Sequence, residues 1–198
     1  TFPQAGNRKT FTFSAWVKRA SFGTTGHTIF ACATDSSNIF AIYFPGESLA
    51  ANQGEFSITD INGGSQHLEK NSHAKLRDVN AWYHLLVGVD MTQSTAEDRV
   101  KAYINGERIT EWTANTIPAQ NTDLKCNQAE AHNIGRMGGV GNYFDGYIAE
   151  VNFIDGTQLT PSSFAETDTT TGEYKPIEYT GTYGTNGFYL NFSDNLGT

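Results

Sequence analysis

The chain has 198 residues, of which 38% are hydrophobic and 13% aromatic, enough for one substantial all-β domain and short for two. Its formal net charge is −8, from 13 Lys and Arg against 21 Asp and Glu. This balance excludes nucleic acid as an expected partner, because phosphate contacts need clustered basic side chains, and it gives no attraction to an anionic membrane. No run approaches the ~18 continuous apolar residues of a membrane-spanning helix, so no membrane insertion is expected.

The chain begins at Thr1 without a methionine and without a visible signal peptide, which suggests a fragment or a processed part of a longer chain. It has two cysteines, Cys32 in the apolar run 29–33 and Cys126 in the polar segment 123–128. Cys32 is expected to be a small buried apolar residue. Whether the two cysteines pair stays open, and no Cys/His spacing typical of a zinc site is present.

Residues 11–18 alternate between apolar and polar side chains with period two, which predicts a strand with one buried face. The other face carries one large aromatic residue, Trp16. Further short strands are expected at 28–33, 39–44 and 56–61, separated by turn-rich segments. The apolar positions of the first strand are Phe11, Phe13, Ala15 and Val17.

Residues 82–90 form the next predicted strand, with Tyr83, Leu85, Val87 and Val89 on one face. Residues 100–104 alternate in the same way. Asn105-Gly106 follows them and is a strong signal for a type I′ hairpin turn, whose two central residues need positive φ. The returning strand is expected at 107–112, and residues 113–127 are expected to be a loop.

The C-terminal third begins with strand character near residues 133–137, followed by a glycine-rich connection. Residues 144–155 are the longest strand candidate. Thr160 and Pro161 have the pattern of a helix cap and a first helical residue, which predicts one helical turn. A closing strand is expected at 188–192, with Phe188, Leu190 and Phe192 facing inward.

Helical periodicity is almost absent, and the short strands are spaced as in a sandwich rather than in alternating strand–helix units. The sequence therefore predicts an all-β fold, a two-sheet antiparallel jelly-roll β-sandwich. We expect one domain over residues 1–198, in which 156–187 form a loop-rich extension before the closing strand.

Three segments resemble the concanavalin A-like jelly roll, in its laminin-G-like and pentraxin-like branch, and the resemblance covers nearly the whole chain. They are residues 11–18, residues 82–85 together with 103–106, and residues 146–156. The same jelly roll hosts endo-glucanases, so the resemblance allows either a binding module or a hydrolase.

The C-terminal segments 159–168, 172–176 and 183–194 look like sandwich domains of tail-fibre and other virion proteins of tailed bacteriophages. This resemblance implies a non-enzymatic module on the virion surface that serves structure or host-surface glycan attachment. Its partners would be other virion proteins and a host glycan, and the module would form a homotrimer. The alternatives are a polysaccharide depolymerase and a secreted cellular laminin-G-like adhesion domain.

Hydrolysis with retention needs two carboxylates about 5 Å apart, which on a strand means residues on one face. Asp145, Glu150 and Asp155 are five residues apart, so neighbours in this set fall on opposite faces of a regular strand. A bulge would change that parity. The Glu-x-Asp-x-x-Glu pattern of the glucanases and the Gly-x-Ser-x-Gly elbow of serine hydrolases are missing, and the histidines show no metal-ligand spacing. We therefore expect no enzyme.

The family resemblance also implies calcium as the one cofactor to test, because such domains often hold it with loop oxygens. The candidate ligands are Asp145, Asp155 and Asp194, together with Asn195, and the alternative for each is a solvated turn residue. A glycan site would use an exposed aromatic residue beside an amide or acid. Trp112, Asn142 and Tyr143 are the rim candidates, with core packing as the alternative for Trp112; Trp16 and Trp82 are expected to be structural residues of core strands.

Overall fold

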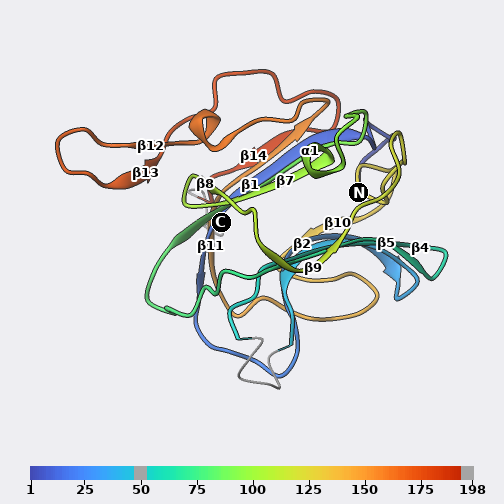
Figure 1. The fold of residues 1–198 in the computed structure, drawn as a ribbon, viewed down its shortest axis with the longest axis horizontal. Helices are drawn as coiled ribbons and strands as arrows, with labels where there is room; N and C mark the ends of the chain where they lie inside the picture. Colours follow the sequence, from blue (N-terminus) through green and yellow to red (C-terminus); the bar gives the residue numbers. More distant parts are fainter. Residues whose placement is uncertain (47–52, 193–198) are drawn as a thin grey trace, which may run out of the picture.

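The computed structural model describes residues 1–46 and 53–192, which fold into two stacked antiparallel sheets (Figure 1). The all-β, two-sheet jelly-roll sandwich that the sequence predicts is confirmed. The strands of the first sheet, in spatial order, are β14 (Phe188–Leu190), β11 (Gly146–Asp155), β1 (Thr10–Arg19), β6 (Tyr83–Asp90), β7 (Val100–Ile104) and β8 (Glu107–Arg108). Those of the second sheet are β10 (His132–Ile134), β2 (His27–Asp35), β3 (Asn38–Phe44), β4 (Ser57–Asn62), β5 (Ser65–Ser72) and β9 (Trp112–Thr116).

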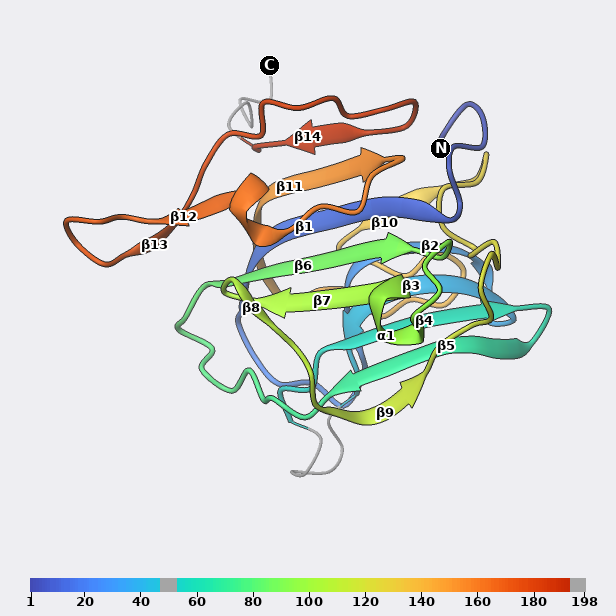
Figure 2. The same cartoon turned by 45° about the horizontal axis from the view of Figure 1, so that its top comes forward.

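The remaining elements are short. β12 (Ala165–Thr167) and β13 (Tyr174–Pro176) pair as a hairpin that projects beside the first sheet (Figure 2). One helical turn, α1 (Ala96–Arg99), joins β6 to β7, and one 3₁₀ turn, η2 (Pro161–Ser163), stands where the sequence predicts a turn. Within residues 1–46 and 53–192, no helix has the length and apolar character needed to cross a membrane.

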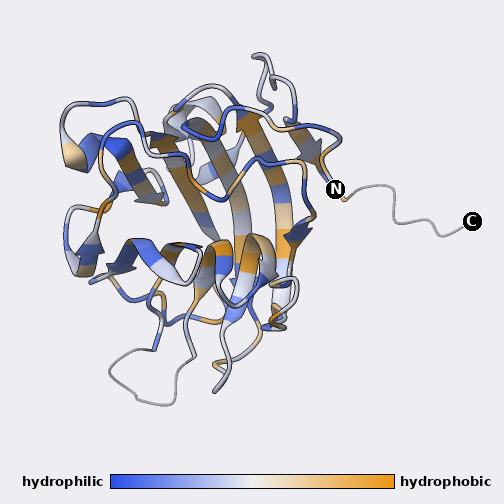
Figure 3. Ribbon diagram, turned by 90° about the vertical axis from the view of Figure 1, so that its right-hand side faces the viewer, coloured by the Kyte–Doolittle hydropathy of each residue, from blue (hydrophilic) through white to orange (hydrophobic). Residues whose placement is uncertain are grey.

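The core lies between the two sheets and follows from the alternation of apolar residues. Leu85, Val87 and Val89 of β6 are fully buried and pack with the inward residues of β1. Across the sandwich, the rings of Phe13 and Phe30 stack with centroids 4.8 Å apart. Burying a phenylalanine side chain contributes roughly 1.5–3 kcal/mol, and Figure 3 shows apolar residues recurring along the strands of both sheets. The inward residues of β1 are Phe11, Phe13, Ala15 and Val17.

The predicted turn at Asn105-Gly106 is confirmed, since both residues have positive φ, 49° and 87°. The strand expected to return over 107–112 is wrong beyond Arg108. The chain leaves the first sheet there, and Trp112 begins β9, which pairs with β5 at the edge of the second sheet. Residues 112–116 are therefore strand where the sequence favours a loop. The edge of β5 supplies backbone hydrogen-bond partners for these residues. The Asn105-Gly106 turn gives no information about that edge.

The closing strand is shorter than expected. β14 covers three residues, and Phe188 packs against the core beside Phe153, with ring centroids 5.8 Å apart. Leu190 and Phe192 do not face inward as the alternation predicts; they are 37% and 49% exposed. The chain stops pairing with β11 after Leu190, and Phe192 takes a positive φ of 57°, so the alternation no longer applies to it.

The extension of residues 156–187 lies across the outer face of the first sheet. Phe164 is buried there against Leu86 and Ile154, which point away from the main core. Hydrogen bonds fasten the start of the extension: the Thr12 hydroxyl donates to the carbonyl of Thr157 at 2.7 Å and accepts from the Leu159 amide at 2.8 Å. The extension therefore acts as a cover over one half of this face.

Cys32 and Cys126 are both buried and both free. Cys32 is the small buried apolar residue that the sequence predicts, and the pairing left open is not made. Cys126 belongs to the main core rather than to an exposed loop. Burial raises the pKa of the Cys32 thiol to about 12, with nearby Glu130 adding to the effect, so this thiol stays protonated at neutral pH.

Candidate functional site

An open groove of about 440 Å³ lies on the outer face of the first sheet, beside the β12–β13 hairpin. We call it the aromatic groove. Residues from β1, β11, β13 and the segment before β6 meet there, so segments far apart in the sequence build one site. Its main lining residues are Trp16, Trp82, Glu150, Glu173, Tyr174 and Lys175.

The floor of the aromatic groove is a group of stacked rings. Alternation in β1 turns Ala15 and Val17 to the core and therefore turns Trp16 outward. The indole of Trp16 stacks on the imidazole of His84, with centroids 5.3 Å apart, and lies 5.7 Å from the ring of Tyr174. Trp16 thus presents aromatic surface to the groove instead of filling the sandwich core.

His84 fixes this floor from below. Its Nε2 shares a hydrogen bond of 2.8 Å with the Ser14 hydroxyl, and its Nδ1 shares one of 3.0 Å with the Tyr174 hydroxyl. The sequence predicts a packed or rim histidine here, and His84 is packed, 1% exposed. Burial lowers its pKa to about 4, so the ring is neutral at pH 7 and links β1 to the hairpin without carrying charge.

The rim carries aromatic residues that remain open to solvent. Trp82 precedes β6 and is 41% exposed, so it is not the structural core residue that the sequence predicts. Tyr147 of β11 is 62% exposed, and its ring centroid lies 6.4 Å from that of Trp82. Two adjacent rings at the mouth of a groove expose apolar faces whose edges can still reach water.

A β-bulge places Glu150 at the groove. The pairing of β1 with β11 shifts between Ser14 and Trp16, and Glu150 takes a positive φ of 50°. Ile148, before the bulge, and Val151, after it, both face the core. They are three positions apart, whereas inward residues of a regular strand are two positions apart. Strand regularity, on which the sequence argument against a carboxylate pair depends, therefore fails at this residue.

Tyr189 of β14 covers one side of Glu150 by donating a short hydrogen bond from its hydroxyl to the Glu150 carboxylate. Burial, together with this hydrogen bond and the charge of Glu150, raises the pKa of Tyr189 to about 12. The Tyr189 hydroxyl therefore remains a donor throughout the physiological pH range, and one oxygen of the Glu150 carboxylate is already hydrogen-bonded to it.

Acidic side chains line the groove. Glu150 and Glu173 line it, while the ammonium of Lys175 lies 2.8 Å from Asp168 and 3.5 Å from Glu166, both in its own hairpin. The positive charge of Lys175 is thus balanced within the hairpin. The two lining carboxylates come from segments that no sequence spacing connects.

The predicted glycan residues lie elsewhere and apart from one another. Trp112 is half-buried in β9, and the fully buried Lys70 places its ammonium 4.2 Å from the indole centre. The backbone carbonyl of Asn142 accepts a hydrogen bond from the Thr28 amide of β2, and Tyr143 beside it is 67% exposed. β9 and β2 lie at opposite sides of the second sheet, so the structure does not join these residues into one site.

The predicted calcium ligands are also separated. Asp145 precedes β11 and accepts a hydrogen bond from the Ser21 hydroxyl at 2.5 Å, whereas Asp155 ends β11, roughly 30 Å away along a strand of this length. Asp155 accepts hydrogen bonds from the Asn7 amide and the Asn127 side chain, at 2.8 and 2.7 Å. Asp194 and Asn195 lie outside the described residues. In the described ranges, no three His, Cys, Asp or Glu side chains gather as a metal site would require.

Comparison with known proteins agrees with this architecture. A family model described as Laminin_G_3, concanavalin A-like lectin/glucanases superfamily, matches residues 1–163. A heptameric SAP-like pentraxin from Limulus polyphemus superposes with a TM-score of 0.54 at 17% identity, over 89% of this chain and 82% of its own. No curated protein gives a significant match.

Two further solved structures share the fold. Domain 4 of the arabinanase AbnA from Geobacillus stearothermophilus, solved in complex with arabinotriose, gives a TM-score of 0.50 at 22% identity, over 80% of this chain and 65% of its own. The K499G mutant of NanB sialidase from Streptococcus pneumoniae gives 0.51 at 14% identity, over 82% of this chain and 26% of its own. At these identities the likeness establishes the fold alone.

Proposed function

Since the chain belongs to the concanavalin A-like lectin/glucanase superfamily, we propose that it is a carbohydrate-binding module and that the aromatic groove is its binding site. The observation that carries the proposal is the joint presence, in one open groove, of aromatic rings, among them the exposed indole of Trp82, and of the two carboxylates of Glu150 and Glu173. The module acts by recognition rather than by cleavage.

The chemistry of the groove suits a sugar. A pyranose or furanose ring presents C–H faces that stack on aromatic rings, and hydroxyls that need hydrogen-bond partners. Trp82, which lines the groove, and the neighbouring exposed Tyr147 offer the stacking faces, and Glu150 and Glu173 offer acceptors. The volume of about 440 Å³ lies within the usual range of ligand sites.

A domain of similar fold has been solved with a bound saccharide. Domain 4 of the arabinanase was solved with arabinotriose, so a domain of this architecture holds a short saccharide. The same architecture also occurs within hydrolytic enzymes, which is why binding and cleavage are separated experimentally below.

The setting that we propose is the surface of a bacteriophage virion, on a tail fibre or another exposed virion protein. The support is the resemblance of residues 159–168 and 183–194 to sandwich domains of such proteins. The partners would then be a host-surface glycan and neighbouring virion proteins, in a homotrimer. Antibody labelling of intact particles tests this setting: signal at the tail tip is expected, and absence from particles contradicts it.

A glycan array tests the binding function. The wild-type chain, with saturating calcium and in a parallel arm with chelator, is compared with Trp82→Ala and with Tyr143→Ala. Tyr143 is the matched control, because it is an exposed aromatic residue at the other predicted rim. Binding is expected for the wild type and for Tyr143→Ala, with a loss of at least tenfold in Trp82→Ala. Loss in Tyr143→Ala alone would move the site to that rim, and no signal from any glycan or host-envelope fraction would overturn the function.

Cleavage is the second candidate, because Glu150 and Glu173 line the same groove. Hydrolysis would release new reducing ends from a bound polysaccharide during long incubation. We expect none from the wild type. Product that appears with the wild type and disappears with Glu150→Gln would make the chain a glycosidase.

A further inference from the structure

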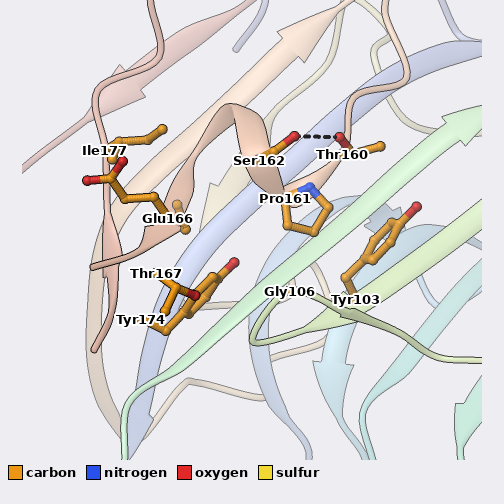
Figure 4. A pocket seen from close by; sticks show the side chains of 10 residues that line it. Tyr103, Gly106, Thr160, Pro161, Ser162, Glu166, Thr167, Tyr174 and Ile177 are labelled. Carbon is orange, nitrogen blue, oxygen red and sulfur yellow. Dashed lines mark hydrogen bonds between the residues drawn. The ribbon is translucent and has the colours of Figure 1, made fainter. Parts of the chain in front are cut away.

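A second hollow, of about 540 Å³, shares Tyr174 with the aromatic groove, and Figure 4 shows the side chains that line it. Its lining comes from the end of β7, the β7–β8 turn, η2 and the hairpin. The residues that matter for its chemistry are Tyr103, Thr160, Ser162, Glu166 and Tyr174.

Tyr174 belongs to both spaces, since it lines the aromatic groove and the second hollow. Its hydroxyl is held by His84 at 3.0 Å, and its ring lies so close to Gly106 that a Cβ there would approach the Tyr174 ring and hydroxyl to 3.3–3.4 Å. The ring is therefore fixed from both sides. It forms a shared wall between adjacent spaces on one face of the sheet.

The second hollow repeats the chemistry of the first. Tyr103 offers a half-buried aromatic ring, and the buried Pro161 also lines the hollow. The hydroxyls of Thr160 and Ser162 are exposed and lie 3.0 Å apart, joined by a hydrogen bond. Paired hydroxyls of this kind can donate to and accept from a sugar hydroxyl.

The charge of the two spaces has the same sign. Glu166 in the second hollow and Asp168 share the ammonium of Lys175, so these three side chains together keep one net negative charge, which adds to those of Glu150 and Glu173 in the first. A uronic or sialic acid would bring further negative charge against these carboxylates, which costs binding energy. Neutral sugar units meet no such repulsion.

We infer that the module binds a linear, neutral oligosaccharide that runs across Tyr174, with one part in the aromatic groove and the next part in the second hollow. The inference rests on the proposed carbohydrate-binding function and adds the ligand's length and charge to it. The protein then recognises internal stretches of a chain rather than a single terminal residue.

Calorimetric titration with saccharide ladders tests the inference. The probes are linear arabino- and gluco-oligosaccharides from monosaccharide to hexasaccharide, the linear glycan with the strongest array signal and its fragments, and uronic-acid ladders of equal length. Affinity is expected to rise about tenfold or more once the chain is long enough to pass Tyr174, and uronic-acid chains are expected to bind at least tenfold more weakly than neutral ones.

The variant for the second hollow is Thr160→Val with Ser162→Ala, because both hydroxyls are exposed and their removal leaves the packing intact. This double variant is expected to bind short fragments like the wild type but to lose the gain with length. Tyr103→Ala gives a second measurement of the same loss. Binding that stays flat with length, or equal affinity for uronic-acid chains, contradicts this inference alone, whereas no binding at any length by any ladder contradicts the proposed function.

Discussion

The same strands build both halves of the outer face of the first sheet, but one half is covered by protein and the other is open to solvent. In the covered half, Leu86 and Ile154 point outward and are buried by Phe164 of the extension. In the open half, Trp16 and Tyr147 point outward from neighbouring strands and line or border a groove. Alternation decides which side chains leave the core, but it does not decide whether they meet protein or solvent.

The difference lies in how the extension is attached. Over the covered half, the Thr12 hydroxyl and the side chain of Gln158 bind backbone groups, the latter donating to the Gly88 carbonyl at 3.1 Å. The aliphatic side chains of Leu86 and Ile154 there pack against the extension. Over the open half, the hairpin touches the sheet chiefly through Tyr174 and His84. Burial in one half stabilises the fold, and exposure in the other leaves the side chains available for the proposed recognition.

The largest expected effect is in the covered half. Phe164→Ala removes a side chain that is 2% exposed and is expected to lower the free energy of unfolding by about 3–5 kcal/mol. The matched change in the open half, Trp82→Ala, is expected to lower it by no more than about 0.5 kcal/mol. Chemical denaturation measures both. Equal losses would mean that the two halves do not divide stability from recognition.

Acid is expected to act on the open half through His84. Its pKa is about 4 in the folded protein because of burial, against about 6.5 when unfolded, so its contribution to stability is present above pH 6.5 and is lost as the pH falls through about 4. The loss is at most about 3 kcal/mol. His84→Gln should flatten the decline of unfolding free energy between pH 6.5 and 4.

The exposed His73 supplies the control for that pH dependence, because its side chain is 68% exposed. His73→Gln should leave the decline unchanged. His132, whose pKa burial also lowers to about 4, contributes to the decline that remains in His84→Gln, and Asp60, whose pKa burial raises to about 6, opposes it. Identical slopes for wild type and His84→Gln would contradict the role assigned to His84.

The smallest expected effect concerns the attachment of the hairpin. Tyr174→Phe removes the hydroxyl that bonds to His84 and is expected to cost about 1 kcal/mol, with faster amide exchange in 165–167 and at 174 and 175. Exchange in residues 156–164 over the covered half should not change. Tyr147→Phe, at a 62% exposed position, is the control and should change neither. Faster exchange throughout 156–187 would show that the halves are held as one unit.

The fold could be predicted because every second residue of β1, β6 and β7 is apolar or aromatic on the inward face, and because Asn105-Gly106 permits a tight turn. The change of sheet before Trp112 could not, because a strand pattern does not say which sheet edge it will join. The short hairpin β12–β13 was equally hidden, since three-residue strands carry no period.

The aromatic groove was partly visible in the sequence. The alternation of residues 11–18 already set Trp16 on the face opposite to Phe11, so its outward position followed from the pattern even though a structural role was expected. Tyr174 gave no signal, because it lies 90 positions from His84, to which it bonds. Trp112, Asn142 and Tyr143 had the right residue types without a common location.

The bulge at Glu150 has a consequence for how this surface can diverge. Trp16 opposes Ala149 and Ser14 opposes Asn152, so β11 contains one residue more than β1 requires at this point. A descendant that lost Glu150 would keep the inward and outward order of its neighbours, while the groove would lose a carboxylate. Deletion, as well as substitution, can thus change the lining of the groove, and with it the sugar preference that the proposed function implies, while leaving the hydrophobic interior unaltered.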